Sequence, residues 1–214
     1  MNIYDIIKSI KSKTMLWIME SKPYLWLASK VIPYIRFNFY YTKIRGSQYK
    51  KGYSVLKPGH IIVSRDHNKL TSFLVGGVWC HASLCVGKGE SSDFEVAEMT
   101  NENYRKSEFF DICKTADRVS ILECDDWDED YVNGTVIPTC VALENSNYDY
   151  KFQLGIKSLY CSELVYESDP ERRLEVSLDD HALLGRQYIS PTGLSKGKNI
   201  KTIWDSDERL NENQ

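Results

Sequence analysis

The rhythm of hydrophobic and polar positions changes near residue 50 and divides the chain into two parts. Residues 1–48 are rich in Ile, Leu, Trp, Tyr and Lys, and the isoleucines of the first ten residues have helical spacing. We predict two helices there, broken near Pro23 and ending near Pro33. From residue 49 onward, short apolar runs alternate with glycine and proline turns, which is typical of mixed helices and strands.

The second part contains several apolar runs of strand length separated by turns. Strands are predicted at 60–64, 78–86, 94–99, 119–122 and 200–204. Helices are predicted at 107–113, 127–132 and 160–166, and the apolar run 135–143 can extend the second helix beyond Pro138. These elements favour an α+β fold in which a small antiparallel sheet or partial barrel packs on helices.

We therefore divide the chain into an N-terminal helical arm (1–48), a domain (49–205) and a polar tail (206–214). The simplest interpretation of the arm is a helical segment packed on the domain. Lysines beside aromatic residues also suit an interfacial membrane-binding segment, and an oligomer contact is a third interpretation. The arm is not expected to span a bilayer, because polar residues and proline interrupt its apolar runs before ~20 residues are reached.

Composition excludes several classes of function. The net charge is −3 and no stripe of Lys and Arg stands out, so nucleic acid is not an expected partner. The six cysteines form no C-x-x-C pair, and no histidine spacing suggests zinc, so no metal or cofactor is expected. No secretion signal precedes the domain, which favours reduced thiols and a cytoplasmic protein, with membrane association through residues 1–48 as an alternative.

One cysteine is placed where a helix should begin. Cys161 opens the predicted helix 160–166, and free N–H groups at a helix start lower the pKa of a thiol and favour the nucleophilic thiolate. The alternative is a small core residue, which is the usual role of a free cysteine. Sequence position alone does not separate these two roles.

One histidine lies near the start of a predicted strand. Alternation places His81, Ser83 and Cys85 on one face of the strand 78–86. An imidazole there can serve as the base for a thiol, or it can simply be a hydrogen-bonded residue at a strand end. The remaining histidines, in turn and loop contexts, are poorer candidates: His60, His67 and His181.

Three further side chains complete the candidate site. Glu98 lies on the next strand, where antiparallel pairing can bring it beside His81 to fix the tautomer of the ring, and Glu95 has the opposite parity. Tyr148 can donate a hydrogen bond to an oxyanion, and Tyr160, next to the cysteine, is assigned with it as an oxyanion or substrate-binding residue. The simpler roles are a solvated charge for Glu98 and a buried aromatic residue with a satisfied hydroxyl for Tyr148.

The order of these segments resembles a known family. It is similar to the circularly permuted branch of the NlpC-type papain-like cysteine hydrolases, which includes YiiX-like and lecithin retinol acyltransferase-like proteins. The resemblance covers about residues 52–200 and implies a permuted papain-like fold, with Cys161 as nucleophile, His81 as base, Glu98 as third polar residue and Tyr148 near the nucleophile. The segments that carry it are 56–63, 79–87, 96–100, 148–152 and 160–166.

The resemblance implies a thiol hydrolase that cleaves an amide bond, in a peptide or cell-wall muropeptide, through a thioacyl intermediate. The alternatives are a lipid ester or N-acyl amide hydrolase or acyltransferase, and a non-catalytic binding module with the same cleft. Two segments depart from the family pattern. The stretch 65–77 is long and partly apolar and can form a lid or a substrate wall, and the N-terminal arm can cover or extend the cleft.

Overall fold

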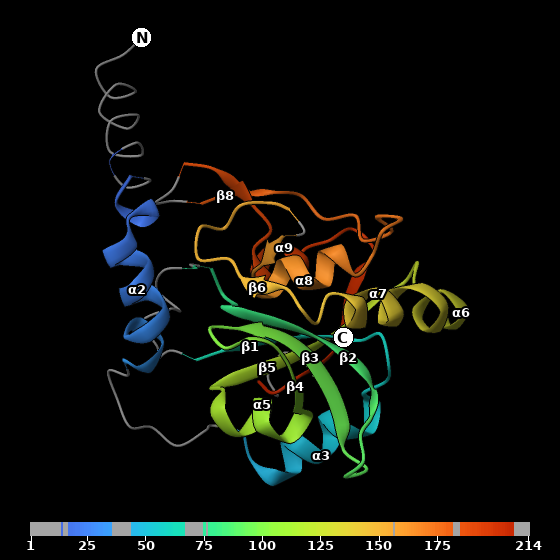
Figure 1. The fold of residues 1–214 in the computed structure, drawn as a ribbon. Helices are drawn as coiled ribbons and strands as arrows, with labels where there is room; N and C mark the ends of the chain where they lie inside the picture. Colours follow the sequence, from blue (N-terminus) through green and yellow to red (C-terminus); the bar gives the residue numbers. More distant parts are fainter. Residues whose placement is uncertain are drawn as a thin grey trace.

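A twisted six-stranded antiparallel sheet forms the centre of the domain (Figure 1). The computed structural model describes residues 14, 17–35, 44–66, 75, 77–155, 157–181 and 185–207. Across the sheet, the strand order is β10-β5-β1-β2-β3-β4. In chain order, the strands of this sheet are β1 (Ile61–Arg65), β2 (His81–Lys88), β3 (Phe94–Thr100), β4 (Asn103–Glu108), β5 (Arg118–Cys124) and β10 (Ile200–Asp205).

Helices cover both faces of the sheet, and short two-stranded pairs lie beside it (Figure 1). None of the helices within the described residues is long and apolar enough to cross a membrane. The remaining elements are α2 (Lys22–Lys30), η1 (Ile32–Tyr34), α3 (Gly46–Val55), α5 (Phe109–Thr115), α6 (Glu129–Tyr131), η2 (Val132–Val136), α7 (Ile137–Ala142), β6 (Asn147–Tyr148), β7 (Ser158–Leu159), α8 (Cys161–Glu167), β8 (Asp179–Asp180), β9 (Gln187–Tyr188) and α9 (Pro191–Leu194).

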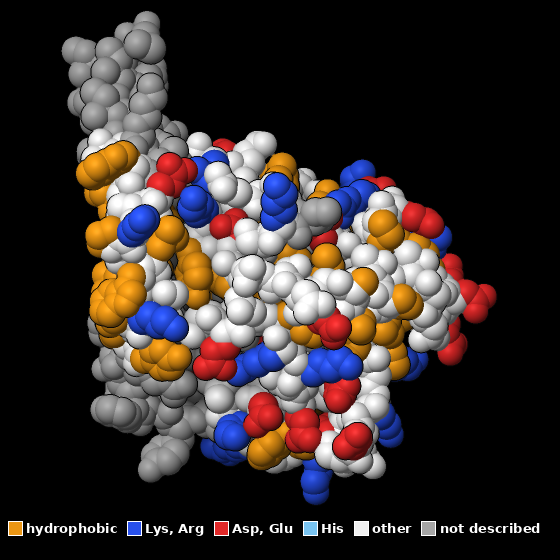
Figure 2. All heavy atoms as spheres, viewed as in Figure 1, with side chains coloured by type: hydrophobic (Ala, Val, Ile, Leu, Met, Phe, Trp, Pro, Cys, Tyr) orange, Lys and Arg blue, Asp and Glu red, His pale blue; other side chains and the backbone are white. Residues whose placement is uncertain are grey.

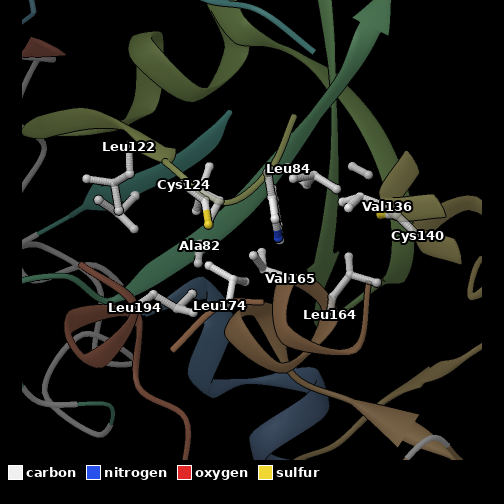
Figure 3. Close-up of a cluster of buried hydrophobic side chains, with 14 of the residues drawn as sticks. Ala82, Leu84, Leu122, Cys124, Val136, Cys140, Leu164, Val165, Leu174 and Leu194 are labelled. Carbon is white, nitrogen blue, oxygen red and sulfur yellow. The ribbon is translucent and has the colours of Figure 1, made fainter. Parts of the chain in front are cut away.

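Strand alternation sends successive side chains into two separate cores. Ile61 and Leu84 belong to the core on the α7 and α8 side, whereas Ile62 and Cys85 belong to the core shared with α3 and α5. Figure 3 shows the first core, where side chains of α8 meet those of β2. The packing of α8 on β2 fixes where that helix begins relative to the end of the strand.

The predicted strands and the helix that continues beyond Pro138 are confirmed, with shifted ends. The strand predicted from residue 78 begins at His81, because the Trp79 N–H donates to Thr192 Oγ1 (3.0 Å) instead of pairing in the sheet. α3 crosses residue 48, and Ser206 remains attached to the sheet through its N–H and the carbonyl of Val119 (2.9 Å).

The predicted helix at 107–113 is wrong in its first two residues, and a strand before it was not predicted. Residues 103–108 form β4, which pairs with β3 across a tight turn where Asn103 has a φ of 72°. β4 is an edge strand rich in charged and polar residues, so it lacks the apolar alternation that identifies a strand. The helix α5 begins only at Phe109.

The described part of the arm lies beside the domain as α2 and η1 (Figure 1). The predicted break is confirmed at Ser21, whose side chain caps α2 by accepting from the Tyr24 N–H (3.4 Å), with Pro23 in the first turn. The helix predicted before this break lies largely outside the described residues. Ala28 of α2 and Ile32 of η1 are buried, so this segment presents one side to the domain.

Candidate active site

The start of α8 places Cys161 at the end of β2. Tyr160 has extended backbone angles (φ −102°, ψ 172°), so the helix begins abruptly at the cysteine. Leu164 and Val165, one turn further on, are fully buried against Ala82 and the neighbouring β2 side chains (Figure 3). The apolar face of a short helix therefore sets the position of the thiol.

The structure brings Cys161, His81 and Glu98 together in one row. Cys161 and His81 line the same cleft and lie close enough for each group to shift the pKa of the other. The Nε2 atom of the His81 ring lies 2.6 Å from Glu98 Oε2. The histidine side chain is 24% exposed and the glutamate side chain only 2%, so the row runs from the cleft into the protein.

Electrostatics in this row favour a charged pair. Burial alone would lower the pKa of His81, but hydrogen bonds to Cys161 and Glu98, together with their negative charges, raise it to about 10. Burial alone would raise the pKa of Cys161, but the His81 hydrogen bond and charge, and the N–H groups of Ala82 and Ser162, keep it below its ordinary value. At neutral pH this geometry favours a thiolate beside an imidazolium.

Two residues that sequence reasoning missed hold the carboxylate of Glu98. Arg105 Nε lies 2.8 Å and Ser107 Oγ 2.5 Å from Glu98 Oε1. Burial alone would raise the pKa of Glu98, but bonds to His81 and Ser107 and the charge of Arg105 lower it to about 2. Both residues lie on β4, and the signal that would have identified them is the alternate spacing of Arg105 and Ser107 on a strand opposite Glu98.

The two tyrosines assigned from the sequence have different positions. Tyr148 lines the cleft together with Cys161, and β6 places it there by pairing with β7, directly before the cysteine. Tyr160 is fully buried and does not line the cleft, because its hydroxyl accepts from the Ile189 N–H (2.9 Å) and its ring packs on Phe152. The assignment of Tyr160 as an oxyanion or substrate-binding residue is corrected to a packing role.

A buried glutamate of α8 fixes one wall of the cleft. Glu163 accepts from the Gly155 N–H (2.7 Å) and from the Tyr160 N–H (3.4 Å). Asp149 holds the other end of the same loop by accepting from the Gln153 N–H. The loop carries Phe152, a cleft residue in the left-handed region (φ 53°). Burial raises the pKa of Glu163 to about 8.

The cleft beside the thiol has a volume of about 630 Å³ and mixed walls. The α2 and η1 elements contribute apolar and aromatic side chains, which agrees with the expectation that the arm extends the cleft. Within the stretch 65–77, Val75 also lines the cleft, whereas 67–74 and 76, part of the predicted lid, lie outside the described residues. The arm residues that contribute are Tyr24, Ala28, Ile32 and Tyr34.

The other histidines and cysteines lie apart from this row or outside the described part of the chain. His60 faces Glu123 (3.6 Å), His181 packs on Tyr188, and His67 is not among the described residues. All six cysteines are free thiols. Among the described residues, no group of three His, Cys, Asp or Glu side chains is arranged to hold a metal ion.

A cysteine that opens a helix against an antiparallel sheet carrying a histidine defines a papain-like cysteine hydrolase fold, and the histidine strand precedes the cysteine helix, so the order is permuted. The chain belongs to the permuted papain-like amidase family YaeF/YiiX, C92, whose family model matches residues 55–206. It is therefore a cysteine hydrolase of a family that acts on amides.

A solved structure shows the same fold at low sequence identity. The crystal structure of the metalloprotein yiiX from Escherichia coli O157:H7 superposes with a TM-score of 0.57 at 13% identity. The match covers 69% of this chain and 96% of that chain. No curated protein matches the sequence.

Proposed function

We propose that this enzyme hydrolyses an amide bond, in a peptide or cell-wall muropeptide, with Cys161 as nucleophile, His81 as acid and base, and Glu98 as the orienting carboxylate. The observation that carries this proposal is the placement of Cys161 beside the hydrogen-bonded pair of His81 and Glu98 at the wall of a large cleft. Membership in an amidase family supports the amide as the reacting bond.

In the first step, the Cys161 thiolate attacks the amide carbonyl carbon, and the carbonyl π electrons move to oxygen. The N–H of Cys161 and the hydroxyl of Tyr148 are the donors proposed for this oxyanion. Burial and the nearby charge of Cys161 hold the pKa of Tyr148 well above its ordinary value, which keeps its hydroxyl protonated as a donor. Their contribution is greatest when negative charge develops on the oxygen.

In the second step, the carbon–nitrogen bond breaks and the His81 imidazolium gives its proton to the leaving amine. The thioacyl enzyme remains. His81, now neutral, accepts a proton from water as the water oxygen attacks the thioester carbon. The carbon–sulfur bond breaks, the carboxylic acid product leaves, and the thiolate and imidazolium are restored. Glu98 stabilises the imidazolium at both ends of this cycle.

Turnover of a panel of peptide amides and muropeptides, followed by mass spectrometry of the products, tests this proposal. Cys161→Ala should abolish turnover while the protein stays folded. Cys80→Ala is the matched control, because Cys80 lines the same cleft but bonds to the Ser64 carbonyl and the Asp66 N–H. Turnover that survives in Cys161→Ala would contradict covalent catalysis.

The apolar wall formed by α2 favours a second candidate, an N-acyl amide or lipid ester whose chain lies along that wall. The two candidates differ in how kcat/KM depends on the acyl group. A rise in kcat/KM with each added pair of methylenes would support the lipid substrate, since each buried methylene contributes ~0.8 kcal/mol. A preference for peptide side chains with no dependence on chain length would support the peptide substrate.

Membership in an amidase family argues against the non-catalytic binding module considered from the sequence. Such a module predicts that the thiol of Cys161 has no special reactivity, because ligand binding needs no thiolate. A Cys161 thiol that reacts no faster near neutral pH than an unstructured cysteine would favour such a module over the enzyme.

A further inference from the structure

The helix α2 has two different faces at helical spacing. Tyr24 and Ala28 lie four residues apart on α2 and line the cleft, and Ile32 of η1, just beyond the helix, lines it too. On the opposite side, Lys22, Trp26 and Lys30 also follow at intervals of four. All three of these side chains are exposed, and Trp26 is 62% exposed.

Exposed apolar side chains concentrate on this segment. Within the described residues, six of the ten exposed large hydrophobic side chains fall between positions 17 and 35. Figure 2 shows them gathered along α2, with basic side chains between them. Trp17, in the helical turn before α2, is the most exposed of the six at 74%. They are Trp17, Ile18, Trp26, Leu27, Tyr34 and Ile35.

The two lysines of this face, Lys22 and Lys30, have no ion-pair partner among the described residues. Some basic residues of the domain do lie against carboxylates, such as Lys106 (3.4 Å from Glu95) and Lys201. The one acidic side chain of the segment 17–35 is Glu20, in the turn before α2.

We propose that the outer face of α2 docks on an anionic lipid bilayer, with Trp17 and Trp26 at the level of the headgroups and Lys22 and Lys30 on the lipid phosphates. Tryptophan flanked by lysine is the chemistry of the membrane interface, since the ring is amphipathic and the ammonium groups meet negative charge. Among the described residues, no carboxylate pairs with either lysine beside this exposed tryptophan.

This docking would bring the cleft close to the bilayer. The face opposite the proposed lipid contact lines the cavity beside Cys161, so one helix separates lipid from cleft by its own diameter, about 10 Å. Docking does not depend on the proposed function, and it would favour substrates held at a membrane surface over those free in solution.

The chain carries its own probe of this contact. Three of its five tryptophans are buried: Trp79, Trp127 and Trp204, at 5%, 8% and 5% exposure. Fluorescence quenching by a lipid therefore reports on the two exposed tryptophans of the arm, Trp17 and Trp26. We expect vesicles of brominated phosphatidylcholine and phosphatidylglycerol to quench the tryptophan fluorescence of the whole 214-residue chain. The same chain should co-sediment with these vesicles.

Two sets of variants test the assignment. Trp17→Ser combined with Trp26→Ser should weaken vesicle binding by at least about tenfold, whereas Phe110→Ser, which changes an exposed aromatic residue of α5, should leave it unchanged. Lys22→Gln and Lys30→Gln should each weaken binding to phosphatidylglycerol vesicles about fivefold, and Lys198→Gln should not.

Three results would overturn the proposal: a wild-type chain that does not bind vesicles, binding that survives loss of both tryptophans, or binding that is equal on neutral and anionic vesicles. A tryptophan-dependent dimer that does not bind lipid, measured by light scattering, would assign the face to a second copy instead. The rate of Cys161 alkylation in solution tests the catalytic proposal separately. This rate should be the same in these variants as in the wild type.

Discussion

Glu98 Oε2 lies 2.6 Å from His81 Nε2 although the two residues are not partners in the sheet register. The residue opposite Glu98 on β2 is Ser83, two positions further along the same face. The glutamate therefore reaches diagonally across the ladder, over a separation that long side chains can span. The small side chain of Ser83 leaves room for this diagonal contact. The carboxylate of Glu98 therefore holds the histidine ring from the neighbouring strand.

The charge of Glu98 is predicted to set the upper pH limit of activity. Because this carboxylate raises the pKa of His81, Glu98→Gln should move the alkaline limb of the kcat/KM profile from about pH 10 to lower pH. It should also reduce kcat/KM by about 10²-fold or more. Glu95→Gln is the control, since Glu95 pairs with Lys106 (3.4 Å). An unchanged profile in Glu98→Gln would remove Glu98 from the mechanism.

The same carboxylate should make the fold sensitive to acid. The pKa of Glu98 is about 2 in the folded protein and about 4.3 in an unfolded chain, so the unfolded state takes up its proton first as pH falls. Its contribution to stability is complete above about pH 4.3 and is lost as pH falls toward 2. Urea unfolding across this range should show a shallower loss of stability in Glu98→Gln than in the wild type.

Glu163 is predicted to act on stability in the opposite direction. Burial raises its folded pKa to about 8, above the value of about 4.3 in the unfolded chain. The folded protein then holds the extra proton between these values, so the contribution of Glu163 to stability falls as pH rises from about 4.3 to 8.

Glu163→Gln should flatten this dependence while its amide oxygen still accepts from the Gly155 N–H. The measurement is the difference in free energy of unfolding between pH 5 and pH 8. Glu167→Gln, at a residue of the same helix that pairs with Arg172 (2.7 Å), serves as the comparison. Equal pH dependence in the wild type and Glu163→Gln would contradict a raised pKa.

Packing beneath the nucleophile should couple stability to activity. Leu164 is fully buried in the core between α8 and β2, so Leu164→Ala should lower the free energy of unfolding by about 2–5 kcal/mol. Denaturant unfolding measures this loss. The same change should slow alkylation of Cys161, because α8 positions the thiol. The account of α8 would be wrong if the variant lost neither stability nor thiol reactivity.

Strand order made a pairing of His81 with a glutamate of the next strand possible, and the family resemblance selected Glu98 over Glu95. Alternation places His81 and Glu98 on one face, and antiparallel neighbours have a limited choice of register. Tyr160 was misassigned because a tyrosine beside a nucleophile looks the same in sequence whether its hydroxyl meets substrate or the Ile189 N–H. That choice depends on β9 and its flanking residues, about thirty positions away.

Residues contributed by edge strands and by the arm could not be predicted in the same way. Arg105 and Ser107 support Glu98 from an edge strand whose solvent-exposed positions carry charge instead of an apolar pattern. The helix α2 was predicted, but which of its faces would line the cleft depends on long-range packing of the arm against the domain.

The most direct test of the central claim is the alkylation rate of each cysteine as a function of pH, read by peptide mapping in the native protein. The account predicts that Cys161 reacts fastest and keeps its rate well below pH 8, and that Cys80 in the same cleft reacts more slowly. A Cys161 rate that falls with acidity like that of an unstructured thiol would contradict the thiolate and imidazolium pair.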